Sequence, residues 1–194
     1  MAATMGSVCH EMSSNLPLNQ EAHTCSTAHA LCAVVSSRSA RSASPLDEAA
    51  AIRIYEMARE LEGARSRHAP ATGSSGLMAC KAAQKLGLIR EYHHAFGLDQ
   101  ALRALTLGPV MTGFSWYSSF DEPDEITGQI HIEPDAVIRG GHEVVAYELD
   151  TERELVWCWN SWGPGYGLGG RFCMDFDTWG QLLEEGGDVT VPLP

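Results

Sequence analysis

Apolar residues in the first half of the chain are grouped in segments that predict helices. The segment 25–37, CSTAHALCAVVSS, combines small and apolar residues, and Cys25 and Cys32 fall on one face because seven residues make about two helical turns. Segments 77–87 and 97–108 predict two shorter helices. Residues 1–19 show no such pattern and read as an irregular leader.

A further helix, between the first and these two, carries its own start and stop signals. Ser44 is the predicted N-cap, Pro45 the first helical residue, and Gly63 follows the end. Asp47 and Glu48 place negative charge in the first turn, where the helix dipole favours it. Polar loops are expected over residues 37–44 and 64–76.

The pattern changes near residue 108, where alternating or continuous apolar runs replace the helical segments. β-branched and aromatic residues dominate four predicted strands, at 109–116, 142–150, 155–162 and 170–176. One late helix (176–185) and a closing strand (188–193) follow. Helices first and strands second predict an α+β fold. We expect one domain, 1–194, with a mainly helical lobe (1–108), a mainly β lobe (109–194) and a cleft between them.

Composition restricts the possible partners. The net charge is −12 and no basic tract is present, which argues against nucleic acid or an anionic membrane as a partner. No apolar run approaches the ~20 residues that span a bilayer, and the N-terminus has no secretory signal pattern, so a cytoplasmic location is expected. The six cysteines are then expected to be reduced. They form no CxxC pair, which disfavours a structural zinc site.

Three residues together suggest nucleophilic chemistry. Cys25 begins a predicted helix, where free backbone N–H groups and the helix dipole favour thiolate. His142 is predicted to open a strand after two glycines, and a hairpin with the next strand would bring it beside Asn160. The amide could then orient the imidazole toward the thiol. Cys25 and His142, each taken alone, are more simply explained as structural residues.

Two motifs match a known family. GGHEVV (140–145) followed by CWNSWGPGYG (158–167) closely resembles the C-terminal half of papain-like cysteine peptidases, in the manner of a compact bacterial or phage relative. The resemblance implies a two-lobe fold and a Cys-His-Asn triad. Cys25 would be the nucleophile, His142 the base and later the acid, and Asn160 the residue that orients it. It implies no metal or organic cofactor, and a protein or peptide as the substrate.

The resemblance also implies substrate contacts. Gln20 would supply the oxyanion-hole amide, although it lies five residues before Cys25 rather than six, and Asn19 is a rival. The predicted substrate-binding residues are Gly73, Ser74, Gly141 and Trp162, the last shielding the His–Asn hydrogen bond from water. Ala22 stands where the family has a disulfide cysteine, and Ser26 where it has an aromatic residue.

The predicted function is peptide-bond hydrolysis through a thioester acyl-enzyme. An amidase, deamidase or acyltransferase, including one that cleaves peptidoglycan cross-bridges, is an alternative because a triad does not specify its substrate. A non-catalytic binding module on the same fold is a second alternative. The adjacent His93 and His94 could suggest a metal site, but on a predicted loop before a helix they are more simply solvated or packing residues. Trp116 either lines the site or packs. Oligomeric state has no sequence signal.

Overall fold

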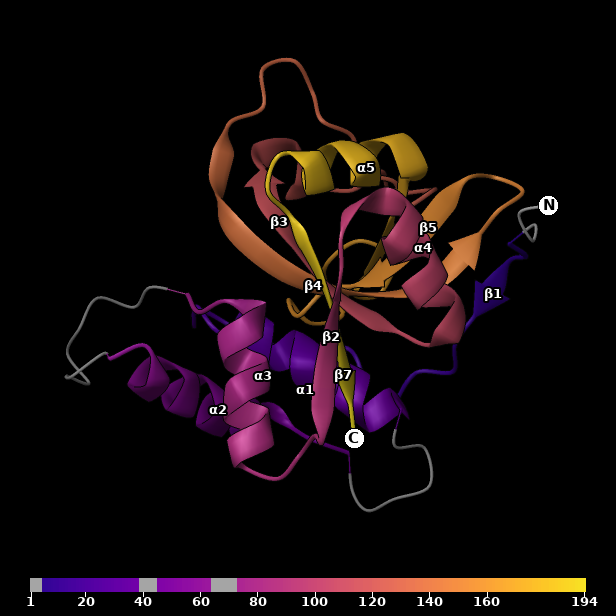
Figure 1. Ribbon diagram of the computed structural model, residues 1–194. Helices are drawn as coiled ribbons and strands as arrows, with labels where there is room; N and C mark the ends of the chain where they lie inside the picture. Colours follow the sequence, from indigo (N-terminus) through magenta and orange to yellow (C-terminus); the bar gives the residue numbers. More distant parts are fainter. Residues whose placement is uncertain (1–4, 39–44, 64–72) are drawn as a thin grey trace.

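The computed structural model describes residues 5–38, 45–63 and 73–194, and in this part of the chain seven strands form one sheet with helices on both faces (Figure 1). The helices are α1 (Ser26–Arg38), α2 (Glu48–Leu61), α3 (Gly76–Lys85), α4 (Gly97–Leu107) and α5 (Phe176–Glu184). The strands are β1 (Val8–Cys9), β2 (Glu91–Ala95), β3 (Val110–Tyr117), β4 (Ile138–Asp150), β5 (Leu155–Trp159), β6 (Arg171–Asp175) and β7 (Asp188–Leu193).

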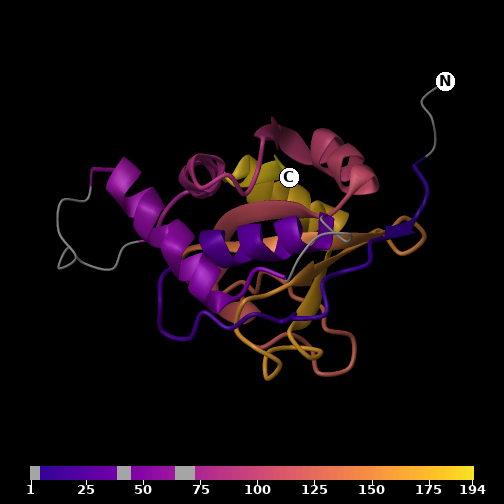
Figure 2. The same cartoon turned by 90° about the horizontal axis from the view of Figure 1, so that it is seen from below.

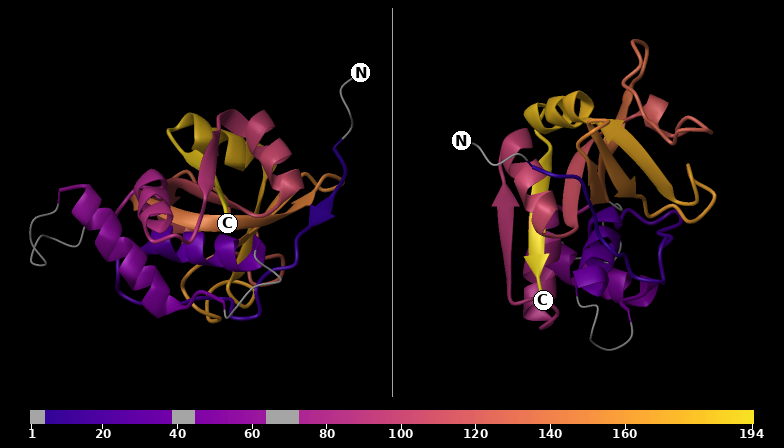
Figure 3. Two further views of the ribbon diagram at one scale, coloured as in Figure 1. Left: turned by 60° about the horizontal axis from the view of Figure 1, so that its bottom comes forward. Right: turned by 90° about the vertical axis from the view of Figure 1, so that its right-hand side faces the viewer.

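The sheet is antiparallel throughout, in the order β2-β7-β3-β4-β5-β6, and β1 pairs with β4. Strand β7 therefore lies between β2 and β3, although it follows both in the sequence. The right-hand view of Figure 3 shows β2 and β7 side by side at one edge of the molecule. The sheet thus combines strands from both halves of the chain.

Strand β4 separates two hydrophobic cores because successive side chains point to opposite faces of a sheet. Val144 and Ala146 belong to the core that α4 and α5 cover, whereas Val145 belongs to the core that α1, α2 and α3 cover. On β3, Val110 and Met111 divide in the same way. Figures 1 and 2 show the two groups of helices on opposite sides of the sheet. The predicted α+β fold is confirmed.

Each predicted helix has a counterpart in the structure, with ends that differ by one or two residues, and the start of α2 differs most. This helix begins at Glu48 rather than at Pro45, and its N-cap is Asp47, whose Oδ1 accepts a hydrogen bond from the Ala50 N–H at 2.9 Å. An aspartate carboxylate caps a helix as well as a serine hydroxyl does. Ser44, the predicted cap, lies outside the described residues.

Two strands were not predicted, and one predicted strand begins earlier. β1 is too short to show an alternating pattern. β2, EYHHA, lies at the sheet edge and lacks apolar alternation, which is why the pattern does not predict it. His93 and His94 therefore lie on a strand, where a loop was expected. Strand β4 begins at Ile138, so His142 lies inside it. Gly140 and Gly141 are exposed strand residues paired with β3 and do not mark a break.

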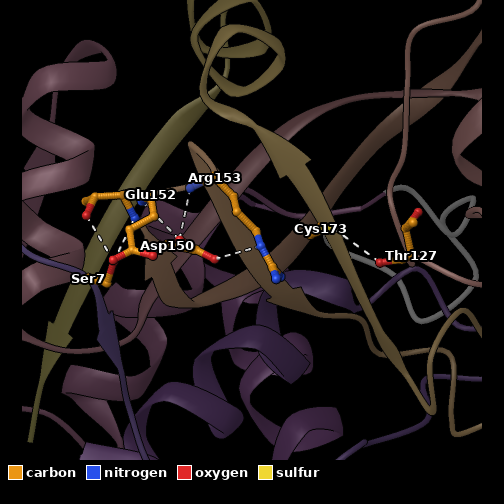
Figure 4. Close-up of polar contacts among 7 residues, drawn as sticks. Ser7, Thr127, Asp150, Glu152, Arg153 and Cys173 are labelled. Atoms are coloured by element: carbon orange, nitrogen blue, oxygen red, sulfur yellow. Dashed lines mark hydrogen bonds and ion pairs between the residues drawn. The ribbon is translucent and has the colours of Figure 1, made fainter.

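Polar contacts fasten the N-terminal segment to the turn after β4 (Figure 4). Asp150 Oδ1 accepts hydrogen bonds from the backbone N–H groups of Glu152 and Arg153, at 3.0 and 3.1 Å, which closes the turn. Thr151, the residue after Asp150, makes two contacts with Ser7. The two hydroxyl oxygens lie 2.9 Å apart, and the Thr151 N–H donates to the Ser7 hydroxyl oxygen.

Among the described residues, no helix has the length and hydropathy needed to cross a membrane.

Trp179 on α5 is expected to be a major source of stability. Its side chain is fully buried in the core under α4 and α5, and its Nε1–H donates to Thr112 Oγ1 on β3 at 3.0 Å. Trp179→Ala should lower the free energy of unfolding by about 3–5 kcal/mol in urea denaturation. Trp179→Phe keeps most of the packing and should cost less. A loss below about 1 kcal/mol for the alanine variant would contradict this account.

Candidate active site

His142 and Asn160 form a direct hydrogen bond. The pairing of β4 with β5 puts Val145 opposite Trp159, so the residue after β5 reaches the side chain of His142. The imidazole Nε2 lies 2.7 Å from Asn160 Oδ1, and both residues are buried. The predicted proximity of these two side chains is therefore confirmed.

A second contact fixes the tautomer of His142. Asn160 Oδ1 also accepts the backbone N–H of Ser161 at 2.8 Å, and a backbone N–H can only donate. The atom facing His142 is thus an oxygen acceptor, and Nε2 must carry the hydrogen. In the neutral ring Nδ1 then has the free lone pair, which is the form that can act as a base.

Aromatic rings enclose this histidine. The Trp116 ring meets it edge-on with centroids 4.7 Å apart, and the Trp162 ring lies at 4.9 Å. Burial among these rings lowers the pKa of His142 to about 4, and the hydrogen bond to Asn160 only partly opposes this effect. The imidazole is therefore neutral at pH 7. Trp116 could either line the site or pack in the core by sequence alone. In the structure it is almost fully buried and contacts the imidazole ring of His142.

Cys25 lies immediately before α1, whose first residue contacts β4. Its carbonyl accepts the first helical hydrogen bonds, from the N–H groups of Ala28 and His29. The next residue, Ser26, accepts a hydrogen bond through its Oγ from the Glu143 N–H at 3.4 Å. The residues that follow Cys25 and His142 are thus in contact, which brings the start of α1 against β4.

The thiol itself turns toward another histidine. Cys25 Sγ lies 3.4 Å from Nδ1 of His29, one helical turn along α1, and the Cys25 side chain is fully buried. We predicted a lowered thiol pKa from the helix start. Instead burial raises the pKa of Cys25 to about 11, outweighing the backbone contribution, which does lower it. The thiol is protonated at pH 7 in this arrangement.

Gln20 and Asn19 differ in their surroundings. Gln20 is buried, its Nε2 donates to the His23 carbonyl at 2.6 Å, and its Oε1 accepts from the Ser161 hydroxyl at 2.6 Å. Its amide is therefore fixed next to the residue that follows Asn160. Asn19 is exposed, and its Oδ1 accepts the Glu21 N–H at 3.0 Å.

A cleft of about 510 Å³ lies beside the start of α1, and Cys25, Gln20 and Asn160 are not among the residues that line it. His142 lines it, together with Ser26 and Thr27 at the start of α1. Three of the predicted substrate contacts, Gly73, Ser74 and Gly141, also line this cleft. The fourth, Trp162, is half-buried and contacts the ring of His142 instead. None of the described residues forms a group of three or more histidine, cysteine or acidic side chains that could hold a metal ion.

Two residues of the site escaped the sequence analysis. Ser161 belongs to the matched motif, yet only the structure shows that its hydroxyl fixes Gln20. His29 lies four residues after Cys25 on the predicted helix, a spacing that puts two side chains on one face. This four-residue spacing is the sequence feature from which a contact between His29 and Cys25 could have been predicted.

Comparisons with known proteins identify the fold. No family model matches the chain, and no curated protein matches its sequence. Xylellain, a cysteine protease from Xylella fastidiosa, aligns with a TM-score of 0.81 at 19% identity, over 99% of this chain and 87% of that chain. The bromelain protease from Ananas comosus, in complex with the E64 inhibitor, aligns with a TM-score of 0.64 at 15% identity, over 91% and 92%. Procathepsin B S9 from Trypanosoma congolense gives 0.63 at 14% identity, over 91% and 71%. The chain therefore has the fold of the papain-like cysteine proteases.

Proposed function

We propose that this protein is a cysteine peptidase that hydrolyses peptide bonds through Cys25, His142 and Asn160. The observation that carries the proposal is the His142–Asn160 hydrogen bond, because it leaves Nδ1 as the basic nitrogen of a neutral imidazole beside the cleft. The fold of known cysteine proteases supports the same reading.

The reaction proceeds in two halves. His142 Nδ1 takes the Cys25 proton while the sulfur attacks the peptide carbonyl, and the C–N bond breaks as the imidazolium gives its proton to the leaving amine. The acyl group remains on sulfur as a thioester. Water then attacks the thioester with His142 as base, and the acid departs as Cys25 regains its proton. The thiol must first leave His29 and turn toward His142, a rotation about the Cα–Cβ bond of Cys25.

The test uses E64, the inhibitor bound in the bromelain structure. The purified protein should lose its hydrolysis of denatured casein on treatment with E64, and intact mass should show one adduct. Peptide mapping should locate that adduct on Cys25 and not on the exposed Cys9. An active protein whose adduct lies elsewhere would contradict the assignment of Cys25.

A non-catalytic binding module is the second candidate. The buried thiol, its high pKa and its contact with His29 favour this reading. It predicts no casein hydrolysis and no selective E64 adduct, so the same experiment decides between the two.

Gln20 is expected to supply the oxyanion-hole amide in preference to Asn19. The fixing of the Gln20 amide by Ser161 and His23 supports this role, since a preorganised donor stabilises a developing oxyanion. Gln20→Ala should lower kcat by about 10²–10³-fold with little change in far-UV circular dichroism. Asn19→Ala, the matched control, should change kcat by less than about threefold. Equal effects of the two variants would contradict the assignment.

The acid limb of the pH–rate profile is expected near pH 4. His142 acts only when neutral, and burial lowers its pKa to about 4, so kcat/KM should fall about tenfold per pH unit below that value. Trp162→Ala opens the ring to water and should move the limb toward the ordinary histidine value. The measurement is kcat/KM from pH 3.5 to 8, with circular dichroism to verify folding. A wild-type limb near pH 6.5 would contradict the lowering of the His142 pKa by burial.

A further inference from the structure

The cleft holds two carboxylates that the proposed mechanism does not use. Glu143 follows His142 on β4, and Asp188 is the first residue of β7. Both line the same cleft of about 510 Å³ as His142 and Gly141. A group bound to them would therefore lie in the same depression as the proposed base.

Gly113 explains how the two carboxylates converge. It lies on β3, directly opposite Glu143 on one side and opposite Asp188 on the other. A Cβ at Gly113 would lie 2.6 Å from Asp188 Oδ1 and 2.7 Å from Glu143 Oε2. Such distances are too short for any side chain. The missing side chain on the middle strand thus leaves the space that both carboxylates occupy.

The described residues provide no cationic partner for this carboxylate pair. In the part of the chain that the structure describes, no ion pair joins Glu143 or Asp188 to a lysine, arginine or histidine. The Thr190 hydroxyl donates to Asp188 Oδ2 at 3.4 Å, and His94 is a more distant positive influence on Asp188. Glu143 is only 4% exposed, and its Oε1 has no hydrogen-bond partner.

An unpartnered buried carboxylate is unfavourable, and its neighbour makes it more so. Burial raises the pKa of Glu143 well above its ordinary value, the charge of Asp188 adds to this, and burial also raises the pKa of Asp188. A cationic group entering the cleft would offset this cost. A guanidinium fits better than an ammonium, because its planar fork of N–H donors can reach two carboxylates at once.

We propose that Glu143 and Asp188 bind a basic side chain of the peptide substrate, arginine in preference to lysine, in a subsite formed around Gly113. That the ligand is a peptide substrate rests on the proposed peptidase function. That the bound group is basic rests on the buried carboxylate pair. It assigns a specificity to the cleft and adds no step to the chemistry.

The first experiment measures selectivity. Fluorogenic dipeptide amides carry arginine, lysine, citrulline or norleucine at either of the two positions before the scissile bond. Citrulline matches arginine in shape without its charge. At one position kcat/KM for arginine should exceed that for citrulline by about 10- to 100-fold, with lysine between them. Equal rates for arginine and citrulline at both positions would overturn the proposal while leaving the peptidase function intact.

Variants test whether the pair is responsible. Glu143→Gln, Asp188→Asn and the double variant should each reduce the arginine-to-citrulline ratio, and the double variant should bring it within about threefold of unity. The ratio is taken within each variant, so a general loss of activity does not affect it. Glu152→Gln, an exposed acid on the turn after β4, changes the net charge equally and should keep the wild-type ratio. If the Glu143 variants do not fold, the half-buried Asp188→Asn alone carries the test.

A binding measurement separates this proposal from the peptidase function. Isothermal titration of the Cys25→Ala variant with N-acetyl-arginine amide should give a Kd at least about tenfold lower than with N-acetyl-citrulline amide. Adding Glu143→Gln and Asp188→Asn should remove the difference. This result would support the subsite even if the protein cleaved no peptide. Equal binding of both amides to the Cys25→Ala variant would count against it.

Discussion

Replacement of Cys25 by alanine is expected to abolish peptide cleavage while the fold persists. In the proposed mechanism the sulfur forms the only covalent bond to the substrate, and alanine has no nucleophilic atom. Removal of a nucleophile from a catalytic triad lowers kcat by several orders of magnitude. We expect a loss of about 10⁴-fold or more in kcat for casein-derived peptides, and no E64 adduct by mass spectrometry.

Matched variants make this test specific. Cys32→Ala removes a fully buried thiol from the same helix, two turns further on, and should keep nearly all activity. The unfolding midpoints in urea should show that the Cys25→Ala protein is folded. Activity retained by folded Cys25→Ala would exclude the proposed mechanism, whereas loss in both cysteine variants would indicate a packing effect in α1.

His142→Ala is expected to cause a similar loss, because among the described residues no other histidine lines the cleft. His142 is held between Trp116 and Trp162 and oriented by Asn160, so its Nδ1 is fixed before substrate binds. We expect kcat to fall by about 10⁴-fold or more. Added imidazole should restore part of the activity by entering the vacated space.

The control for this prediction is His93→Ala, which removes an exposed histidine from β2. It should leave kcat and KM unchanged. His29→Ala is informative in another way, since it removes the present partner of the Cys25 thiol. If His142→Ala kept its activity and His29→Ala lost it, the base would be His29, and the proposed triad would be wrong.

The fold is largely predictable from the sequence, because apolar residues recur with the helical or the strand period along each long element. The α1, α3 and α4 segments and the strands β3 to β7 differ from their predicted ranges mainly at their ends. The elements that were missed depend on distant partners. β2 has no apolar alternation of its own, and its pairing with β7 makes it a strand. The cap of α2 moved to Asp47, since several polar residues there could accept the same hydrogen bond.

The candidate site was predictable only where a motif fixed it. The pairing of His142 with Asn160 follows from two neighbouring strands and one quoted motif. The direction of the Cys25 thiol depends on a rotamer and on the burial around it, and neither can be read from neighbouring residues. Glu143 and Asp188 lie forty-five positions apart, and only their common partner Gly113 on the middle strand brings them together.

The order of strands also bears on synthesis. The ribosome makes β7 last among the strands, yet β7 fills the gap between β2 and β3. A nascent chain that ends before residue 188 therefore leaves β2 without a partner strand and one edge of β3 unpaired, and it lacks Asp188 from the lining of its cleft. The cleft is therefore complete only once translation has passed this last strand.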